Sequence, residues 1–340
     1  LFTFGYAFKP WTGPPIASGD EILNYLNEVI EENDIEQHIR YEHTIETAEW
    51  SSEHKRWTLK VTHNRSEDRL TFTCGFLWMC HGYYRHSDPY TPEWPGMERF
   101  EGDIVHPQIW PDDLDYTNKR IVVVGSGATA ATLIPAMANE AEHVTMLQRS
   151  PTFFVARPNN NELADTLREL DIPDEWTHEI VRKKILHDQQ QVVEMSFKYP
   201  DLVREELYKG IREILGEDYD VSTHFEPAYR PWQQRIALIP DGDLFHSIAA
   251  GDASVVTDEI STFTEAGIET KSGQLLEADI IVTATGFDLS ILGDISFTVD
   301  SKPLDFSSTV GYRGMMFTGI PNMMWVFGYF RASWTLRADL

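Results

Sequence analysis

The stretch Val122-Val123-Val124-Gly125-Ser126-Gly127-Ala128-Thr129-Ala130 decides the fold of this chain. It begins within the run Arg120–Val124, whose β-branched residues are typical of a strand buried on both faces of a parallel sheet. Residues 128–139 then have a helical pattern, and His143–Leu147 is again strand-like. A glycine turn between a buried strand and a helix is the context that the dinucleotide-binding fingerprint requires. The stretch therefore predicts a Rossmann-like domain; the alternative is a purely structural glycine turn.

The small residues of the turn each have a physical role. Gly125 permits the tight turn, and Gly127 lacks a Cβ, so the backbone can approach a pyrophosphate. Ala130 lets the helix pack close to the strand. The helix N-terminus offers free N–H groups and the positive end of its dipole to the phosphates. The residues predicted to bind the pyrophosphate are Gly125, Ser126, Gly127, Ala128 and Thr129.

The second predicted strand ends in Gln148-Arg149-Ser150. At this position an NAD-binding domain usually has Asp or Glu, which accepts a hydrogen bond from a ribose hydroxyl. A carboxylate is absent here, and Arg149 is suited to pair with the 2′-phosphate of NADP. We therefore predict that Gln148, Arg149 and Ser150 bind NADPH; the alternative is that Arg149 only ends a solvated strand.

Composition excludes several classes of partner. The chain has 340 residues, with 54 Asp and Glu against 28 Lys and Arg, a net charge of −26. Such a surface repels nucleic acids and anionic membranes, so neither is expected as a partner. Two cysteines, no apolar run of 18 residues and no signal-peptide pattern predict a cytoplasmic protein without a transmembrane segment.

The remaining sequence predicts a mixed α/β protein. A loop covers residues 1–19, and 85–118 reads as a structured connector rich in Pro and Gly. Other expected elements are a helix over Asp20–Glu32 with Asp20 as its cap, strands over His38–Trp50, Arg56–Asn64 and Arg69–Cys80, helices over 160–220 and short strands over 255–285.

One segment points to a known family. Phe100-Glu101-Gly102-Asp103-Ile104-Val105-His106-Pro107-Gln108-Ile109-Trp110-Pro111 resembles the F-x-G-x-x-x-H-x-x-x-W-P signature of the Baeyer–Villiger, or class B, flavin monooxygenases. It lies just before the fingerprint, as it does in that family. The resemblance runs along the whole chain and is greatest to a mycobacterial subgroup. Further matching segments are Phe8–Gly13, Met146–Pro151, Pro240–Phe245, Ala284-Thr285-Gly286 and Ala332–Leu336.

The resemblance implies FAD, NADPH and O2 as reactants. In the family, reduced FAD and O2 form a peroxide at flavin C4a, which inserts oxygen into a ketone or oxygenates the sulfur of a sulfide or thioamide. The substrate is then a small apolar ketone or sulfur compound. The implied fold has two Rossmann-like domains, of which the FAD-binding one is incomplete. An NADP-binding domain (116–284) with a helical insertion (160–230) interrupts the FAD-binding domain (1–115 and 285–340).

The resemblance also assigns site residues. The active-site arginine of the family matches Arg235, in Pro231-Trp232-Gln233-Gln234-Arg235. A guanidinium there would stabilise the oxyanions of the reaction. His106 and Trp110 act in the family through conformation and cofactor binding; a lone His without Cys or carboxylate partners predicts no metal site. The remaining implied cofactor contacts are Gly82, Thr285, Gly286 and Asp288.

The chain departs from the family pattern at several places. The N-terminal FAD fingerprint is absent, so we expect a chain cut at both ends, with an exposed sheet edge that favours homo-oligomers. Cys80-His81-Gly82 replaces a small or hydroxyl residue before Gly, which bears on the flavin contact at Gly82. Phe330-Arg331 stands where the subgroup has Thr-Asn, which would reshape the pocket near the flavin.

Three other readings stay open. A disulfide reductase shares the two-fingerprint plan, but Cys74 and Cys80 have a C-x5-C spacing instead of a redox pair. A second reading is a non-catalytic NADP-binding fragment, and a third is a flavin-dependent NADPH reductase without oxygenation. The sequence alone does not choose between ketone and sulfur oxidation.

Overall fold

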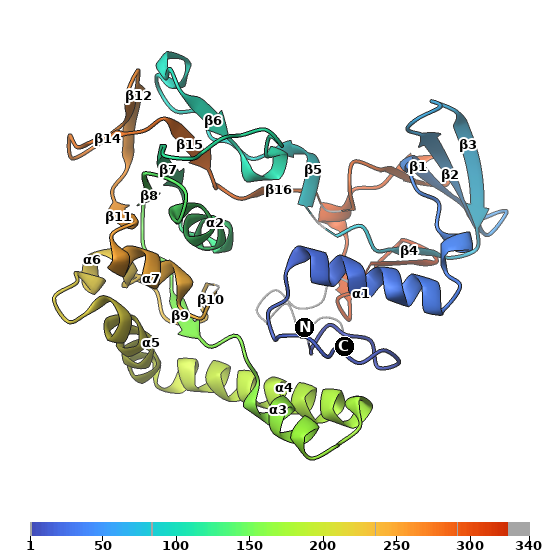
Figure 1. Cartoon of the computed structure of the whole chain (residues 1–340). Coiled ribbons are helices and arrows are strands. Elements are labelled where there is room, and N and C mark those ends of the chain that lie inside the picture. The colour runs from blue at the N-terminus through green and yellow to red at the C-terminus, as the bar shows by residue number, and fades with distance from the viewer. Residues whose placement is uncertain (1, 83, 235, 291, 326–340) are drawn as a thin grey trace. The chain divides into compact units, whose positions relative to one another are not determined.

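The computed structural model describes residues 2–82, 84–234, 236–290 and 292–325. The chain divides into two compact units (Figure 1). Unit 1 comprises residues 1–85, 163–186 and 289–340, and unit 2 comprises residues 86–162 and 187–288. The predicted domain limits at 115 and 284 fall within unit 2, and the predicted domains remain a prediction.

Unit 2 is built on a five-stranded parallel sheet with the strand order β11-β8-β7-β15-β6. The buried run Arg120–Val124 is β7, at the centre of this sheet, with a partner strand on each side. Both faces of β7 are covered, which explains why its residues 121–124 are all buried. The strands are β6 (Asp103–Val105), β7 (Arg120–Val124), β8 (His143–Gln148), β11 (Ala253–Thr257) and β15 (Ile280–Thr283).

Alternate residues of β7 enter different cores. Ile121 and Val123 pack among helices α2 (Ala128–Ala138), α5 (Pro200–Leu215) and α7 (Asp243–Ala250). Val122 and Val124 pack on the other face, against a three-stranded antiparallel sheet. That sheet consists of β12 (Ile260–Thr264), β13 (Gly267–Thr270) and β14 (Leu275–Glu277). Unit 2 therefore has three layers: the helices, the parallel sheet and the antiparallel sheet. Successive residues of a strand point to opposite faces of the sheet, so a strand whose residues are all buried must be covered on both faces.

The prediction of a connector over 85–118 was wrong where β6 forms. This strand pairs with β15 through Ile104 and Ile281 and makes the sheet edge. Three residues are too few to show a strand period in sequence. Gly102 lets the chain pass close to the backbone of Asp279, just before β15, because a Cβ at Gly102 would overlap the Asp279 carbonyl oxygen. The connector also contains β5 (Tyr84–Pro89), which pairs with β16 (Phe287–Leu289), and the 3-10 helices Met97–Arg99 and Pro107–Ile109.

The helices predicted over 160–220 are confirmed as α3 (Glu162–Glu169), α4 (Asp174–Lys198) and α5. Beyond them lie the short helix α6 (Val221–Phe225) and the parallel pair β9 (Phe154–Arg157) and β10 (Ala237–Pro240). Among the residues described, every helix is too short or too polar to cross a lipid bilayer.

Unit 1 contains a five-stranded sheet with the order β18-β17-β1-β2-β3 and a parallel pair, β21 and β4. Its strands are β1 (His43–Ser51), β2 (Arg56–His63), β3 (Arg69–Cys74), β4 (Leu77–Met79), β17 (Ser296–Val299), β18 (Lys302–Pro303), β19 (Gly311–Tyr312), β20 (Met316–Phe317) and β21 (Met323–Trp325). The last predicted strand before the connector is thus split into β3 and β4.

The predicted first helix is confirmed as α1 (Gly19–Glu32), but its cap is Ser18 and not Asp20. The Ser18 hydroxyl accepts a hydrogen bond from the Glu21 N–H, and the Glu21 carboxylate accepts one from the Ser18 N–H. This reciprocal capping box satisfies two backbone N–H groups at the start of the helix.

Replacing Trp57 with alanine is expected to lower the free energy of unfolding by about 3–5 kcal/mol. Trp57 is fully buried in the core of unit 1, and its indole N–H donates to the Asn322 carbonyl at 3.1 Å. Trp78→Ala is the matched control, because Trp78 is 60% exposed, and surface changes cost within about 0.5 kcal/mol. Urea unfolding measures the free energy of unfolding of both variants. An equal loss of stability in the two would contradict the placement of Trp57 in the core.

Candidate functional site

The predicted nucleotide contacts of unit 2 gather at one edge of its parallel sheet. Residues 125–129 follow β7, residues 148–150 end and follow β8, residues 285–288 follow β15, and residues 106–110 follow β6. Because these strands are parallel, their carboxyl ends meet at the same edge. From β7 the chain continues through α2 to β8 on one side, while β15 lies on the other (Figure 1). Ligands of open α/β sheets bind at such a switch point.

The two glycines of the turn differ in what they permit. Gly125 has a φ of 130°, and an added Cβ would overlap the carbonyl oxygen of Ala284. Its N–H donates to the Leu147 carbonyl at 2.8 Å, which ties the turn to β8. Gly127 has ordinary extended angles, and a Cβ there would have no atom of the described residues within 4 Å. Gly125 is therefore required by the fold, whereas Gly127 leaves an open space for a ligand.

Helix α2 begins at this open space with unpaired N–H groups. Gly127 is the N-cap, and no side chain caps the helix. Ala128 and Thr129 follow, and Ala128 is exposed. Ala130 is fully buried, so the helix lies close to the sheet, as predicted. Free N–H groups and the positive end of the helix dipole suit an anion such as a pyrophosphate. The geometry thus fits the nucleotide that the sequence implies.

The end of β8 exposes two of its three predicted residues. Arg149 and Ser150 are exposed, and within the described part of the chain the Arg149 side chain has no ion pair or hydrogen bond. Gln148 is 1% exposed, and its Nε2 donates to the His224 carbonyl at 2.6 Å and to Thr257 Oγ1 at 2.9 Å. Arg149 is therefore available to a ligand, whereas Gln148 anchors the strand end.

A hydroxyl pair lies beside the turn. Ser126 Oγ is 3.1 Å from Thr152 Oγ1 and donates more weakly to the Ser150 carbonyl, at 3.4 Å. The predicted contact Ser126 is thus near the residues that follow β8. These two contacts join the turn after β7 to the segment that follows β8.

His106 is a structural residue in this geometry. It is 6% exposed, and its Nδ1 accepts a hydrogen bond from the Gln108 N–H at 3.1 Å, which caps the following 3-10 helix. Burial lowers the pKa of His106, while the backbone of Gly286 and Tyr90 facing the ring opposes this shift. The ring is therefore neutral near pH 7. Trp110 packs, partly buried, against the helix-side core.

The turn after β15 is held by its threonine. Thr285 Oγ1 donates to the Tyr90 carbonyl at 2.6 Å, and Gly286 has a φ of 100° with open space around it. Asp288 follows in β16, partly exposed. Since the backbone at Gly286 is open, it can approach a ligand closely.

The other predicted residues lie elsewhere. Gly82 belongs to unit 1, where it follows the carboxyl end of β4 with a φ of 75° and no atom near a Cβ position. Arg235, Phe330-Arg331 and the segment Ala332–Leu336 lie outside the described residues. Sequence reasoning missed His224 and Thr257, because they follow Gln148 by 76 and 109 residues and carry no motif.

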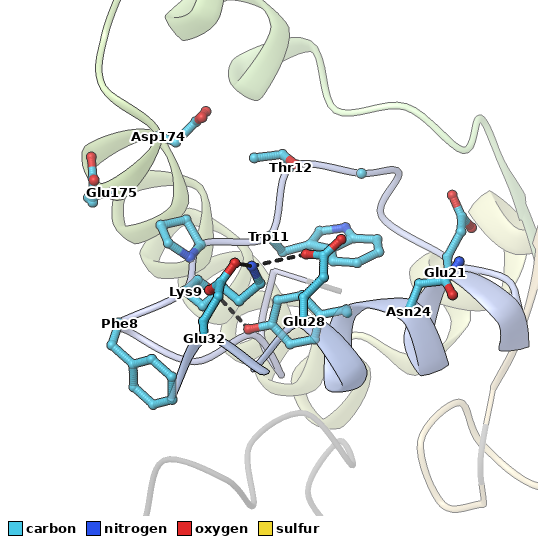
Figure 2. Close-up of a pocket in the computed structure, with 13 residues that line it drawn as sticks. Phe8, Lys9, Trp11, Thr12, Glu21, Asn24, Glu28, Glu32, Asp174 and Glu175 are labelled. Carbon is cyan, nitrogen blue, oxygen red and sulfur yellow. Dashed lines mark hydrogen bonds and ion pairs between the residues drawn. The ribbon is translucent and has the colours of Figure 1, made fainter. Parts of the chain in front are cut away.

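Unit 1 has a separate acidic cleft of about 530 Å³, shown in Figure 2. Lys9, in the segment Phe8–Gly13 that resembles the family, forms ion pairs with Glu28 at 2.9 Å and Glu32 at 2.7 Å. The Trp11 N–H donates to Nδ1 of the buried His178 at 3.1 Å. These bonds fasten the N-terminal segment to α1 and α4. None of the predicted site residues that the structure describes lines this cleft.

Comparisons with known proteins point in one direction. A family model described as flavin-binding monooxygenase-like matches residues 11–167. The chain is 45% identical to the FAD-containing monooxygenase EthA of Mycobacterium tuberculosis (strain H37Rv) over 342 aligned positions, which cover all of this chain and 69% of that protein. EthA of Mycolicibacterium smegmatis gives the same identity and coverage.

Solved structures with the same fold are also monooxygenases. An oxidized steroid monooxygenase bound to NADP superposes with a TM-score of 0.77 at 23% identity, covering 99% of this chain and 73% of that one. A cyclohexanone monooxygenase bound to ε-caprolactone gives a TM-score of 0.75 at 18% identity, covering 99% and 74%. At these identities the likeness concerns the fold, and it confirms the predicted α/β class with Rossmann-like domains.

Proposed function

Because the chain belongs to the family of FAD-containing, flavin-binding monooxygenases, we propose that it uses FAD and NADPH to transfer one atom of O2 to a small apolar ketone or sulfur compound. Relatives at 45% identity that align with the whole chain establish the family and its monooxygenase class. The cofactor sites and the choice of substrate are our proposal. The observation that carries it is the open, uncapped start of α2 beside an unpaired Arg149.

The nucleotide site is proposed at the carboxyl edge of the parallel sheet in unit 2. The pyrophosphate would lie on the N–H groups at the start of α2, over Gly127. Arg149, one strand further along the sheet, would pair with the 2′-phosphate. No carboxylate from β8 competes for that position, since the strand ends in Gln148. The site therefore favours NADPH over NADH.

The FAD site is proposed to use unit 1. Strands β4 and β21 are parallel, and Cys80-His81-Gly82 follows the carboxyl end of β4. Among the described residues no atom lies near the Cβ position of Gly82, so the backbone there can approach a flat ring system. The thiol of Cys80 is small and does not close this space, so the departure from the family pattern is compatible with flavin binding there.

FAD held in this way would supply the redox chemistry, namely acceptance of hydride from NADPH and activation of O2. The chain's residues bind and orient the reactants and keep water away from them. His106, as a neutral ring, caps the 3-10 helix that follows β6, and it is proposed to have no role in proton transfer. Ketone and sulfur oxidation would use the same cofactor sites, so the proposal covers both substrate classes.

Cofactor loading tests the proposal. The purified chain is incubated with FAD, desalted and examined by visible absorbance, and NADPH is then added without oxygen. We expect a retained flavin band that bleaches with NADPH. A chain that binds NADPH but retains no flavin would instead be an NADP-binding fragment.

Replacing Arg149 with alanine is expected to weaken NADPH binding by about 10- to 100-fold and to leave NADH binding nearly unchanged. The lost charge-assisted contact to the 2′-phosphate is worth about 1.5–3 kcal/mol. Titration calorimetry with both nucleotides measures this. Arg65→Ala is the control, because Arg65 is 81% exposed and lies in unit 1. An equal loss for both nucleotides would remove the 2′-phosphate role.

A further inference from the structure

Three side chains from separate elements form a hydrogen-bonded chain at the end of β8. Gln148 Nε2 donates to Thr257 Oγ1 at 2.9 Å, and Thr257 Oγ1 is 2.9 Å from His224 Nδ1. Gln148 Nε2 also donates to the His224 carbonyl at 2.6 Å. Thr257 is the register partner of Gln148 in the sheet. The imidazole of His224 is therefore held at the carboxyl edge through Thr257 and Gln148, the residue that precedes Arg149.

The hydrogen bond between Thr257 and His224 is compatible with a tautomer that leaves a donor on the far side of the ring. Thr257 Oγ1 accepts from the Gln148 amide, so its own hydrogen is free to donate to His224 Nδ1. With Thr257 as the donor, Nδ1 is the acceptor and the neutral ring carries its hydrogen on Nε2, and this is the tautomer on which the proposal is built. Burial lowers the pKa of His224, although the nearby Asp220 opposes this. The half-buried ring thus offers an N–H donor at Nε2, which is not among the buried unpaired atoms.

Two carboxylates are engaged elsewhere: Asp220, which acts electrostatically on His224, and Asp258, which follows Thr257 in the chain. Asp220 accepts from the Thr223 N–H at 3.1 Å and from the Ser222 hydroxyl at 2.7 Å, and so caps α6. Asp258 accepts from the Ser272 N–H at 3.0 Å and from its neighbour's N–H at 2.7 Å. Neither carboxylate accepts a hydrogen bond from His224. The Nε2 donor is therefore available to an anion from outside the chain.

We propose that His224 is a second recognition residue for the 2′-phosphate of NADP, held in position by Gln148 and Thr257. This inference rests on the proposed function, which places that phosphate at Arg149. It also explains the glutamine at this position. Both partners of Gln148 Nε2 accept hydrogen bonds, so a carboxylate there would face a carbonyl oxygen without a proton to share. The network that orients His224 thus excludes the acidic residue of an NAD site.

Two pairs of variants test the proposal by the affinities of NADP⁺ and NAD⁺, measured by calorimetry. His224→Leu removes the donor, and His224→Gln restores an N–H near the position of Nε2. Thr257→Val removes the hydroxyl at constant shape, and Thr257→Ser keeps it. We expect His224→Leu to weaken NADP⁺ by roughly tenfold, and Thr257→Val by roughly threefold to fivefold. NAD⁺ affinity should stay within about twofold, and the Gln and Ser variants should recover most of the NADP⁺ affinity.

Two outcomes would overturn this inference. Unchanged NADP⁺ affinity in both His224→Leu and Thr257→Val would place the ring away from the phosphate. Equal losses for NADP⁺ and NAD⁺ would make the network a structural support only. Arg149→Ala, measured alongside, distinguishes failure of the proposed nucleotide site from failure of the proposed role of His224. If that variant keeps its preference for NADP⁺, the proposed nucleotide site itself is wrong. If only the His224 and Thr257 variants keep it, the site stands and His224 has no part in it.

Discussion

Valine in place of Gly127 is expected to weaken NADPH binding by at least about 100-fold while the chain remains folded. Gly127 has extended backbone angles that any residue adopts, and nothing lies within 4 Å of its Cβ position. The protein itself therefore tolerates a side chain there. A bound pyrophosphate would not, because the branched side chain would occupy the space over the first N–H groups of α2. Calorimetric titration with NADPH, together with thermal unfolding, measures both quantities.

Gly125→Val provides the contrast for this prediction. At Gly125 the φ of 130° and the overlap with the Ala284 carbonyl act on the fold itself. That variant should unfold at a lower temperature, whereas Gly127→Val should melt like the parent chain. If Gly127→Val binds NADPH with unchanged affinity, the open start of α2 is not the pyrophosphate site.

Alanine in place of Arg235 is expected to reduce oxygenation by about 100- to 1,000-fold while NADPH still reduces the flavin. Arg235 lies outside the described residues. Its expected role follows from the sequence Pro231-Trp232-Gln233-Gln234-Arg235 and from family membership. A guanidinium stays charged at all working pH values and can stabilise negative charge that develops on oxygen during transfer. Rapid-mixing absorbance gives the rate of flavin reduction, and product analysis gives the rate of oxygenation.

Arg235→Lys tests whether charge alone is sufficient. It keeps the positive charge but loses the planar fork of donors, so we expect only partial activity. Arg149→Ala should behave in the opposite way, with slower reduction at low NADPH and normal oxygenation when NADPH is saturating. Retained ketone or sulfide oxidation in Arg235→Ala would exclude the catalytic role.

The sequence predicted those parts of the fold whose signals are local. The run Arg120–Val124 is β7 to the residue, and the glycine turn and α2 follow where expected. Both signals come from neighbours in the chain, namely β-branched residues and the spacing of small ones. Arg149 is exposed directly after a predicted strand, and its role in nucleotide binding stays a prediction.

Features that depend on distant partners were not predicted. The three-residue β6 exists because β15 pairs with it, from 177 residues further on, at Ile104 and Ile281. Gln148 was expected to contact the cofactor, but the structure buries it against His224 and Thr257. An amide at a strand end has the same sequence signature in either role. Only the tertiary partners decide which one it has.

The cysteines give little support to the disulfide-reductase reading. Cys74 ends β3 and Cys80 follows β4, and both are free thiols. Desolvation raises the pKa of each thiol, which lowers the fraction of reactive thiolate at neutral pH. A redox pair needs the opposite shift in at least one thiol.

The most direct measurement is the mass of the product formed from a test ketone and a test sulfide under ¹⁸O₂, with the FAD-loaded chain and NADPH. We expect an ester or sulfoxide that contains one ¹⁸O atom and that forms only when NADPH is present. NADPH consumption that yields hydrogen peroxide and no labelled product from either compound would contradict this expectation. The chain would then be a flavin-dependent NADPH reductase and not an oxygenating enzyme.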